Sequence, residues 1–347
     1  MSKMDLPIAA LVEHWQVAHG RSHLPWQQTR DPYRVWLSEV MLQQTQVKTV
    51  LDYYPRFLER FPDVAALAIA PEEDVFALWS GLGYYSRARN LHRCARQVML
   101  LHQGTFPETV PELQNLPGIG RSTAGAIAAF CFAQRAPILD ANVRRVLTRL
   151  LAFDADLAIS ANEKALWQEA TALLPHKNLA QSMPRYTQGL MDLGAMVCLP
   201  RKPLCTQCPL QLKCAAHRHG NPELYPVRTR KLVRKSESWW LLLLRDDLGR
   251  MRLERRADKG IWSGLHCVPV FAESSQLTSH PSLKHAVKRT ELPSFLHVLT
   301  HKDLHLHAVI VDVCASGSEG AAEGWFSRDQ WQSLGLPSPI RKLLEAA

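Results

Sequence analysis

Two acidic residues stand where their carboxyl groups would hold opposite protonation states. Glu39 lies in Val35–Leu42, a segment that is apolar nearly all round and therefore predicts a buried helix. Burial raises the pKa of a carboxyl group and keeps it protonated, as a general acid must be. Asp140 precedes a segment with helical spacing, and a helix N-terminus favours the ionised form. Glycosidic cleavage uses such a pair of one neutral and one charged acid.

Both acids also have a simpler interpretation. Glu39 could belong to a polar strip with Ser38 and Gln46 on an otherwise ordinary helix. Asp140 could be only an N-cap, a position that aspartate favours. Capping and catalysis do not exclude each other, so the second interpretation leaves a catalytic Asp140 open.

A glycine-containing turn lies between the two acids. It reads Leu116-Pro117-Gly118-Ile119-Gly120 and precedes a helix of small residues predicted over Arg121–Phe132. The glycines let the backbone pass close to another molecule, and the first amides of the helix form a natural seat for a phosphate. The pentapeptide fits a DNA-binding helical hairpin and an ordinary helix–helix connection equally well.

Four of the eight cysteines fall within seventeen residues, in the pattern C-x6-C-x2-C-x5-C. In a chain without a secretory signal, such clustering predicts a metal site and not disulfides. The spacing allows zinc or an iron–sulfur cluster, since only one C-x2-C pair is present. The clustered residues are Cys198, Cys205, Cys208 and Cys214. The other cysteines are expected in the core: Cys94, Cys131, Cys267 and Cys314.

The length of 347 residues predicts two domains. Helical spacing prevails up to about residue 216, with a helix expected from Asp31-Pro32 through Val47 and short helices opened by Pro71 and Pro111. Strand patterns follow at Ser238–Leu244, Met251–Arg256 and Leu304–Val313, the first two joined by a turn at 246–249. We therefore expect a mainly α domain over 1–220, a linker over 221–236 and a smaller α+β domain over 237–347.

The chain carries 41 Lys and Arg against 32 Asp and Glu, a formal charge of +9, which suits a polyanionic partner. The expected linker concentrates basic side chains that could follow a phosphate backbone or could simply be solvated. These are Arg228, Arg230, Lys231, Arg234 and Lys235. The longest purely apolar run, Trp239–Leu244, is too short to span a bilayer, and no signal peptide is evident. We expect a soluble intracellular protein with no membrane partner.

Several quoted motifs carry a resemblance that covers essentially the whole chain. They are Trp36–Val47 (WLSEVMLQQTQV), Gly81–Asn90 (GLGYYSRARN), Leu116–Ser122 (LPGIGRS) and Met191–Met196 (MDLGAM), together with the four clustered cysteines. With these motifs the chain closely resembles the adenine DNA glycosylases of the MutY type, in the helix-hairpin-helix or endonuclease III superfamily. The resemblance implies one 4Fe–4S cluster on the four cysteines, a bacterial-type cytoplasmic, nucleoid-associated enzyme, and a monomer.

The resemblance also implies the reaction, hydrolysis of the N-glycosidic bond of adenine mispaired with 8-oxoguanine or guanine in duplex DNA. Glu39 would protonate the departing adenine, and Asp140 would stabilise or trap the sugar cation. Because base and sugar are inaccessible inside the stack, the adenine must be flipped out, at a cost of roughly a few kcal/mol.

Further positions match the family residue by residue. Gln44 and Tyr84 match residues that fill or wedge the opened stack, although plain packing is the simpler interpretation of a Tyr-Tyr pair. Gly118 and Gly120 would bring the hairpin to the DNA backbone. The remaining matches concern the substrate, with Trp26 and Gln188 at adenine-pocket positions and Asn142 near the reacting sugar.

Ser122 separates this chain from its nearest rival function. Endonuclease III-type enzymes carry a lysine at this hairpin position, which forms a Schiff base with the sugar and then breaks the strand. A serine cannot form a Schiff base, so the resemblance implies a glycosylase without strong lyase activity. The alternatives are an endonuclease III-like glycosylase/lyase for oxidised pyrimidines and a non-catalytic DNA-binding protein with a zinc knuckle.

The second domain resembles the Nudix-like module that contacts 8-oxoguanine in this family. The matching run is Leu299-Thr300-His301, in which family members commonly have an aromatic residue, a serine and a histidine. Thr300 retains a hydroxyl group for the lesion, and Lys302 and Asp303 are predicted as two extra residues before the following strand. The glutamate-rich helix of Nudix hydrolases is missing from the sequence, which predicts binding without pyrophosphatase activity.

Overall fold

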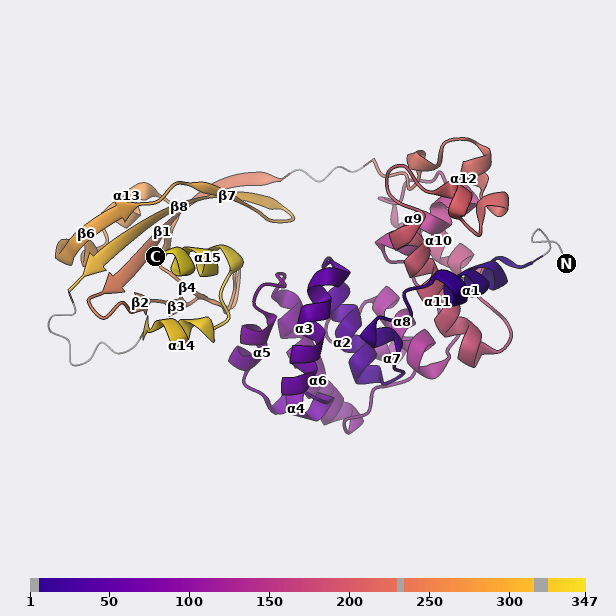
Figure 1. Cartoon of the computed structure of the whole chain (residues 1–347), viewed down its shortest axis with the longest axis horizontal. Coiled ribbons are helices and arrows are strands. Elements are labelled where there is room, and N and C mark those ends of the chain that lie inside the picture. The colour runs from indigo at the N-terminus through magenta and orange to yellow at the C-terminus, as the bar shows by residue number, and fades with distance from the viewer. Residues whose placement is uncertain (1–5, 230–233, 315–323) are drawn as a thin grey trace. The chain divides into compact units, whose positions relative to one another are not determined.

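The computed structural model describes residues 6–229, 234–314 and 324–347, which divide into two compact units (Figure 1). The first comprises 6–54, 58–68 and 93–229, and the second comprises 55–57, 69–92 and the residues described after 233. Residues 69–92 therefore group with the strands although they precede most of the helices. The domain bounds expected at 220 and 237 stay predictions, and Arg230 and Lys231 of the basic stretch lie outside the described residues.

Helices prevail up to Arg218, as the spacing predicts. The α-helices are α1 (Ile8–His19), α2 (Pro32–Leu42), α3 (Val47–Arg60), α4 (Val64–Ile69), α5 (Glu72–Trp79), α6 (Ser86–His102), α7 (Val110–Gln114), α8 (Arg121–Phe132), α9 (Ala141–Leu151), α10 (Ser160–Ala172), α11 (Leu179–Met196) and α12 (Ala215–Arg218). Four 3-10 turns accompany them: η1 (Pro25–Gln27), η2 (Cys205–Gln207), η3 (Gln211–Lys213) and η4 (Pro222–Leu224).

Helix α2 begins where the sequence predicts and ends earlier. The Asp31 carboxylate accepts a hydrogen bond of 2.8 Å from the Arg34 amide, and Pro32 occupies the first helical position. The expectation of one helix through Val47 is wrong, because the chain turns after Leu42 and Gln44 adopts a left-handed φ of 57°. No glycine marks this break, so the sequence gives no clear signal of it.

The predicted hairpin is formed by α7 and α8, and α8 has the expected bounds. Gly118 has a φ of 77°, a conformation that favours glycine. A Cβ atom on Gly125 of α8 would lie 2.3 Å from the carbonyl oxygen of Pro137, so only glycine allows the segment before Asp140 to pass this close. Helix packing thus fixes the path of the chain into α9.

The second unit contains a mixed sheet of seven strands in the order β6-β8-β1-β2-β9, with β5 also paired to β1 and β7 to β8. The central β1 and β8 run parallel, with Lys235 opposite Lys302 at one end and Asp246 opposite Val313 at the other. The strands are β1 (Lys235–Asp246), β2 (Met251–Arg252), β5 (Val270–Phe271), β6 (Ala286–Glu291), β7 (Phe295–Val298), β8 (Lys302–Val313) and β9 (Trp325–Phe326). A separate pair is formed by β3 (Glu254–Arg255) and β4 (His266–Cys267).

Both faces of this sheet are covered by helices. Leu241 and Leu243 of β1 pack with residues of α14 (Arg328–Gln332) and α15 (Ser338–Ala346), whereas Leu242 and Leu244 pack with α13 (Ser274–Thr278). The alternation along one strand therefore supplies two cores, as expected for a strand buried on both sides.

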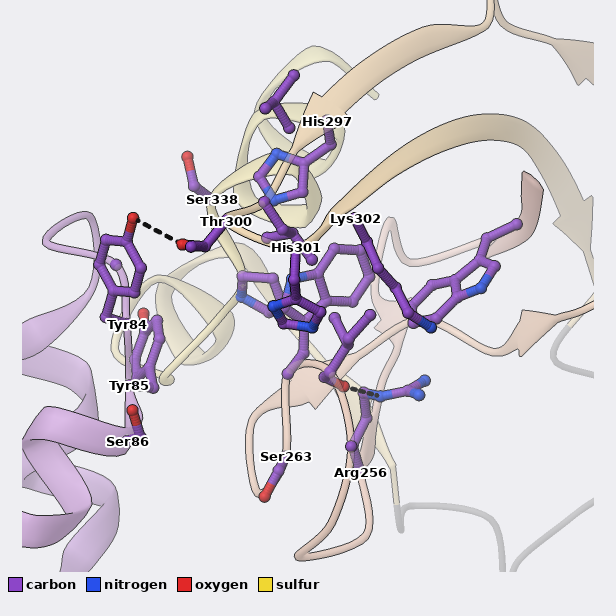
Figure 2. Close-up of a pocket in the computed structure, with 18 of the residues that line it drawn as sticks. Tyr84, Tyr85, Ser86, Arg256, Ser263, His297, Thr300, His301, Lys302 and Ser338 are labelled. Carbon is purple, nitrogen blue, oxygen red and sulfur yellow. Dashed lines mark hydrogen bonds between the residues drawn. The ribbon is translucent and has the colours of Figure 1, made fainter. Parts of the chain in front are cut away.

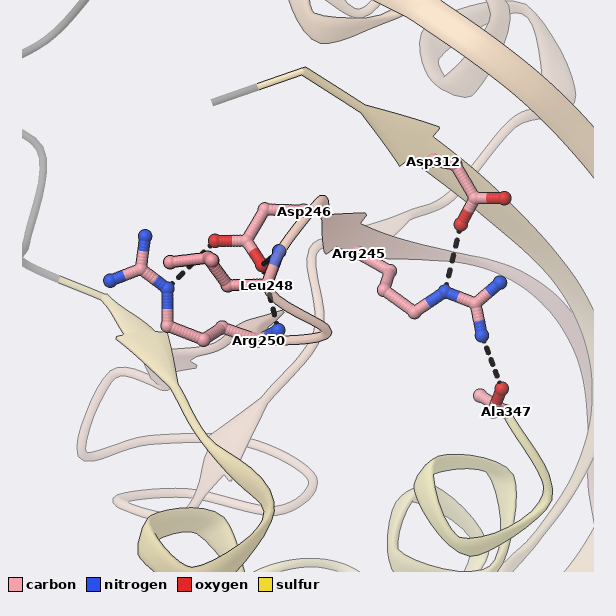
Figure 3. A network of polar contacts seen from close by, with 6 residues as sticks. All are labelled: Arg245, Asp246, Leu248, Arg250, Asp312 and Ala347. Atoms are coloured by element: carbon pink, nitrogen blue, oxygen red, sulfur yellow. Dashed lines mark hydrogen bonds and ion pairs between the residues drawn. The ribbon is translucent and has the colours of Figure 1, made fainter. Parts of the chain in front are cut away.

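A polar network closes the far end of β1 (Figure 3). Arg245 donates to the Asp312 carboxylate at 2.8 Å and to the main-chain oxygen of Ala347. In the predicted turn, Asp246 accepts from the amide of Leu248 at 3.1 Å and from the amide and guanidinium of Arg250, both at 2.7 Å. These bonds hold the hairpin and the end of α15 against the sheet.

Three smaller expectations need correction or confirmation. Lys302 and Asp303 do not precede the strand but are its first two residues, because they continue the pairing with β1. Cys94 and Cys267 are buried as expected, whereas Cys131 is partly exposed and Cys314 is exposed. Within the described ranges, no helix is long and apolar enough to cross a membrane.

Candidate active site and nucleic-acid interface

A cavity of about 180 Å³ in the helical unit brings together Glu39 and two predicted pocket residues, Trp26 and Gln188. Trp26 comes from η1, Glu39 from α2 and Gln188 from α11, so three distant segments build it. Trp26 is held edge-on by Tyr54, with ring centroids 5.4 Å apart. The remaining lining residues are Gln16, Ser22, Gln27, Arg30, Val35, Ser38, Phe130, Pro184 and Arg185. The cavity has the mixed apolar and polar walls that a nucleobase requires.

Glu39 has the properties of a general acid. Burial, and secondarily the negative charge of Asp140, raises its pKa from 4.5 to about 8. The side chain still borders the cavity, so its proton can reach a group bound there. The two acids that the sequence singled out therefore act on one another electrostatically.

Asp140 is the N-cap of α9, and its carboxylate accepts a hydrogen bond of 2.7 Å from the Val143 amide. These helix amides and the nearby Arg145 lower the pKa of Asp140, but desolvation outweighs them and raises the pKa overall. The helix N-terminus therefore acts as expected on Asp140, but burial of the segment opposes it and has the larger effect on the pKa.

Asn142 is two residues after this cap, in the first turn of α9, and is fixed from two sides. The side-chain oxygen of Asn142 accepts a hydrogen bond from Arg145 at 2.9 Å. Gly194 of α11 packs so closely that a Cβ atom added to it would lie 2.6 Å from the Cβ of Asn142. Arg145 also donates to the main-chain oxygen of Cys198 at 2.7 Å. The start of α9 is thus joined to α11 and to the cysteine segment.

Two residues of the site were missed by the sequence prediction. The amide nitrogen and oxygen of Gln27 are buried and lack a hydrogen-bond partner among the described residues, although Gln27 lines the cavity. Such groups are costly to bury unless a ligand meets them. Asp192 is fully buried and binds Gln188 and Arg21. It belongs to the quoted Met191–Met196 motif, which could have drawn attention to it.

The hairpin presents main-chain donors. Gly120 caps α8 without any side-chain hydrogen bond, and the space that a Cβ there would enter is open. The first amides of α8 are therefore accessible to an anion. Ser122 faces the other way, because its hydroxyl oxygen accepts from the Leu139 amide at 3.1 Å. Ser122 thereby ties the hairpin to the segment that carries Asp140.

Gln44 and Tyr84, the two predicted wedge residues, share an unusual backbone. Gln44 has a φ of 57° and Tyr84 a φ of 49°, both in the left-handed region that residues other than glycine rarely adopt. Both side chains are exposed, Tyr84 by 46%. Exposed residues held in strained turns are typical of functional contacts.

A larger cavity of about 880 Å³ lies in the second unit and contains Tyr84, Thr300 and His301 (Figure 2). The Thr300 hydroxyl donates to the Tyr84 hydroxyl at 3.2 Å. Aromatic rings form part of the wall, with Trp262 at 5.3 Å from Trp239, centroid to centroid. The described residues that line this cavity include arginine, lysine and histidine but no carboxylate. The cavity therefore suits an aromatic, anionic ligand such as a nucleotide.

The four clustered cysteines line one small cavity, as the spacing predicts for a metal group. Burial raises the pKa of Cys208 to about 12, and main-chain amides of Leu210 and His217 partly offset burial at Cys208 and Cys214. Arg149 donates to the Cys198 sulfur at 3.4 Å. Across the described residues, no three metal-binding side chains are close enough for a single ion. Partly buried thiols with such donors suit a bound cationic group, which would replace their protons.

Comparison with known proteins gives the family. Residues 37–170 match the family of HhH-GPD superfamily base excision DNA repair proteins, and residues 239–346 match the NUDIX domain. An adenine DNA glycosylase of Buchnera aphidicola subsp. Baizongia pistaciae is 36% identical over 341 residues, 95% of this chain and 94% of the relative. The chain belongs to the adenine DNA glycosylase family.

Solved structures agree with this family in fold. A thermostable thymine-DNA glycosylase matches 61% of this chain and 95% of its own at 28% identity, with a TM-score of 0.53. An endonuclease III trapped on DNA matches 63% of this chain and 99% of its own at 22% identity, with a TM-score of 0.51. The expected fold, a helical glycosylase domain followed by a Nudix-like domain, is confirmed. The adenine DNA glycosylase family places the chain among DNA-binding base excision repair hydrolases of N-glycosyl bonds, in a superfamily that typically carries iron–sulfur groups.

Proposed function

We propose that this chain removes adenine mispaired with 8-oxoguanine or guanine from duplex DNA and leaves the strand intact. The observation that carries the proposal is the protonated Glu39, with a pKa of about 8, at the wall of a cavity of about 180 Å³. A neutral carboxyl group at neutral pH can donate a proton to a base that leaves poorly. The cavity is lined by residues of the helical unit, so the adenine must be flipped out of the stack to enter it.

The two acids divide the work of breaking the bond. Glu39 gives its proton to a ring nitrogen of adenine, and the electron pair of the N-glycosidic bond leaves with the base. Positive charge then develops on the deoxyribose, where the Asp140 carboxylate stabilises it or attacks it. Asn142, held by Arg145 at 2.9 Å, would keep the sugar beside that carboxylate. Water completes the hydrolysis.

DNA would be held by main-chain groups and by two strained side chains. Gly118 and Gly120 would let the hairpin approach a backbone phosphate, and the start of α8, where Gly120 has no side-chain cap, supports this contact. Gln44 and Tyr84 would occupy the space that the flipped base leaves, since both project from exposed left-handed turns.

The lesion would be read in the second unit. The bond between Thr300 and Tyr84 brings a hydroxyl group from each to one wall of the cavity of about 880 Å³. His301 adds a donor on the same wall (Figure 2). Hydroxyl and imidazole donors can distinguish 8-oxoguanine from guanine by the groups at C8 and N7.

The cofactor would be one 4Fe–4S cluster on Cys198, Cys205, Cys208 and Cys214. The donor set supports this assignment, because four thiols line one cavity and thiolates are the ligands that hold such clusters. Such a cluster would fold and brace this segment. Arg145 and Arg149 would connect the segment to α9.

A lyase reaction is disfavoured by Ser122. Its hydroxyl group is occupied by the Leu139 amide and offers no amine for a Schiff base. Replacing it (Ser122→Lys) is expected to permit some trapping of the sugar by borohydride. A complete lack of trapping would argue against placing this helix beside the substrate.

The decisive experiment is a single-turnover assay on a labelled duplex with adenine opposite 8-oxoguanine, with and without subsequent alkali. We expect strand breaks only after alkali, which indicates base removal without lyase activity. Breaks without alkali would favour an endonuclease III-like lyase, and no base removal by protein loaded with its cluster would refute the proposal.

A further inference from the structure

We infer that Asp192 is a positioning residue that fixes the side-chain amide of Gln188, so that the adenine cavity accepts a 6-amino group and rejects a 6-oxo group. This inference rests on the proposed function, since it concerns which base enters the same cavity. It starts from one partly buried hydrogen bond between neighbouring turns of α11.

Asp192 receives three donors and is fully buried. Its Oδ1 accepts from the Arg21 Nε at 2.7 Å and from the Gln188 Nε2 at 3.0 Å, and its Oδ2 accepts from the Arg21 amide at 3.0 Å. The ion pair with Arg21 joins segments 171 residues apart in the sequence. Two bonds to a residue outside α11 prevent this carboxylate from turning with Gln188.

The chemistry of a carboxylate decides which end of Gln188 faces it. An ionised carboxylate only accepts hydrogen bonds, so the amide nitrogen of Gln188 must point at Asp192. The amide oxygen then projects from the opposite side of the group. Gln188 lines the cavity, and we place this oxygen toward a bound base. An amide turned by 180° would set oxygen against oxygen in a buried site, which is strongly unfavourable.

A fixed acceptor discriminates between purines. The 6-amino group of adenine donates a hydrogen bond to it, whereas the 6-oxo group of hypoxanthine or guanine meets it with a second acceptor. Gln27 adds a second amide whose nitrogen and oxygen are buried without a partner among the described residues. No bond to a described residue fixes the orientation of the Gln27 amide, whereas Asp192 fixes that of Gln188, so we assign the preference to Gln188.

The test uses two duplexes, with adenine or hypoxanthine opposite 8-oxoguanine. For each duplex, binding by the variant is compared with binding by the protein that retains Gln188. Binding is measured in the Glu39→Gln protein, which blocks turnover, with and without the additional change Gln188→Leu. We expect Gln188→Leu to weaken adenine binding about tenfold and to strengthen hypoxanthine binding, because the repelling oxygen is removed. Weaker binding of both duplexes would mean that Gln188 rotates to suit either base, and would overturn the inference.

Substitution of Asp192 gives an independent readout. Asp192→Leu removes the acceptor and should reduce the preference for adenine over hypoxanthine about tenfold. Asp192→Asn is the matched control, since two donors at Oδ1, one of them charged, hold its amide oxygen in place and keep the preference within about threefold. Thermal melts check folding, and an unchanged preference in folded Asp192→Leu contradicts the inference. Adenine removal by the unmodified protein tests the proposed function separately.

Discussion

The two cavities of this molecule differ in size and in the chemical groups that line them. The cavity of the helical unit is small, about 180 Å³, and contains a carboxyl group with a pKa near 8. The cavity of the second unit is about 880 Å³ and, among the described residues that line it, has aromatic rings and cations but no carboxylate. The first has a carboxyl group that can donate its proton, whereas the second offers ring faces and hydrogen-bond donors to a bound group. We therefore expect substitutions in the first cavity to lower the rate of adenine removal, and substitutions in the second to lower the preference for the base opposite adenine.

The largest expected effect is loss of turnover in Glu39→Gln. Without the proton donor, the rate of adenine removal should fall by about 10³-fold or more, because general acid catalysis contributes about that much. Binding to the mismatched duplex should change little. Single-turnover rates and fluorescence anisotropy measure the two effects, with Thr300→Ala as the matched variant from the other cavity. Equal loss of rate in both variants would contradict the separation of roles.

The pH dependence of adenine removal should show the same acid. Since the pKa of Glu39 is about 8, the protonated form is lost above that pH. The single-turnover rate should therefore fall about tenfold for each further pH unit. Glu39→Gln should show no such decline. A rate that stays constant up to pH 10 would mean that another group donates the proton.

Glu39 should also make stability depend on pH. The pKa is 4.5 in the unfolded chain and about 8 when folded, so the folded state holds an extra proton between these values. The favourable contribution is complete below pH 4.5 and is lost as the pH rises toward 8. Glu39→Gln should consequently gain a few kcal/mol over the parent at pH 8.5, on the order of several degrees in Tm, and little at pH 5. If the difference in Tm between Glu39→Gln and the parent were the same at both pH values, the pKa of Glu39 would not be raised by burial.

The smallest effect is expected in the second cavity. Thr300→Ala removes the hydroxyl group that bonds Tyr84 at 3.2 Å. The preference for 8-oxoguanine over guanine opposite adenine should fall about fivefold, the effect of one hydrogen bond. Parallel rate measurements on the two duplexes give this ratio, and Thr300→Ser should preserve it. An unchanged ratio in Thr300→Ala would place lesion recognition elsewhere.

The sequence predicts what depends on neighbouring residues. The bounds of α8, the Asp140 cap and a strand over Ser238–Leu244 follow from local patterns, and the structure contains them. The break after Leu42 depends on a left-handed Gln44, for which the sequence has no glycine as a signal. The ion pair of Asp192 with Arg21, 171 residues away, and the place of Gln27 in the cavity depend on distant segments, which spacing along the chain cannot reveal. The net rise in the pKa of Asp140 likewise comes from burial by other helices.

Gly125 touches no base, sugar or phosphate in the proposed reaction, yet a single additional carbon atom there would collide with Pro137 O at 2.3 Å. The strain would move the segment that ends in Asp140. A Gly125→Ala protein would therefore keep both acids and still misplace the Asp140 carboxylate. Surveys of variants should therefore weigh this glycine with the acids themselves.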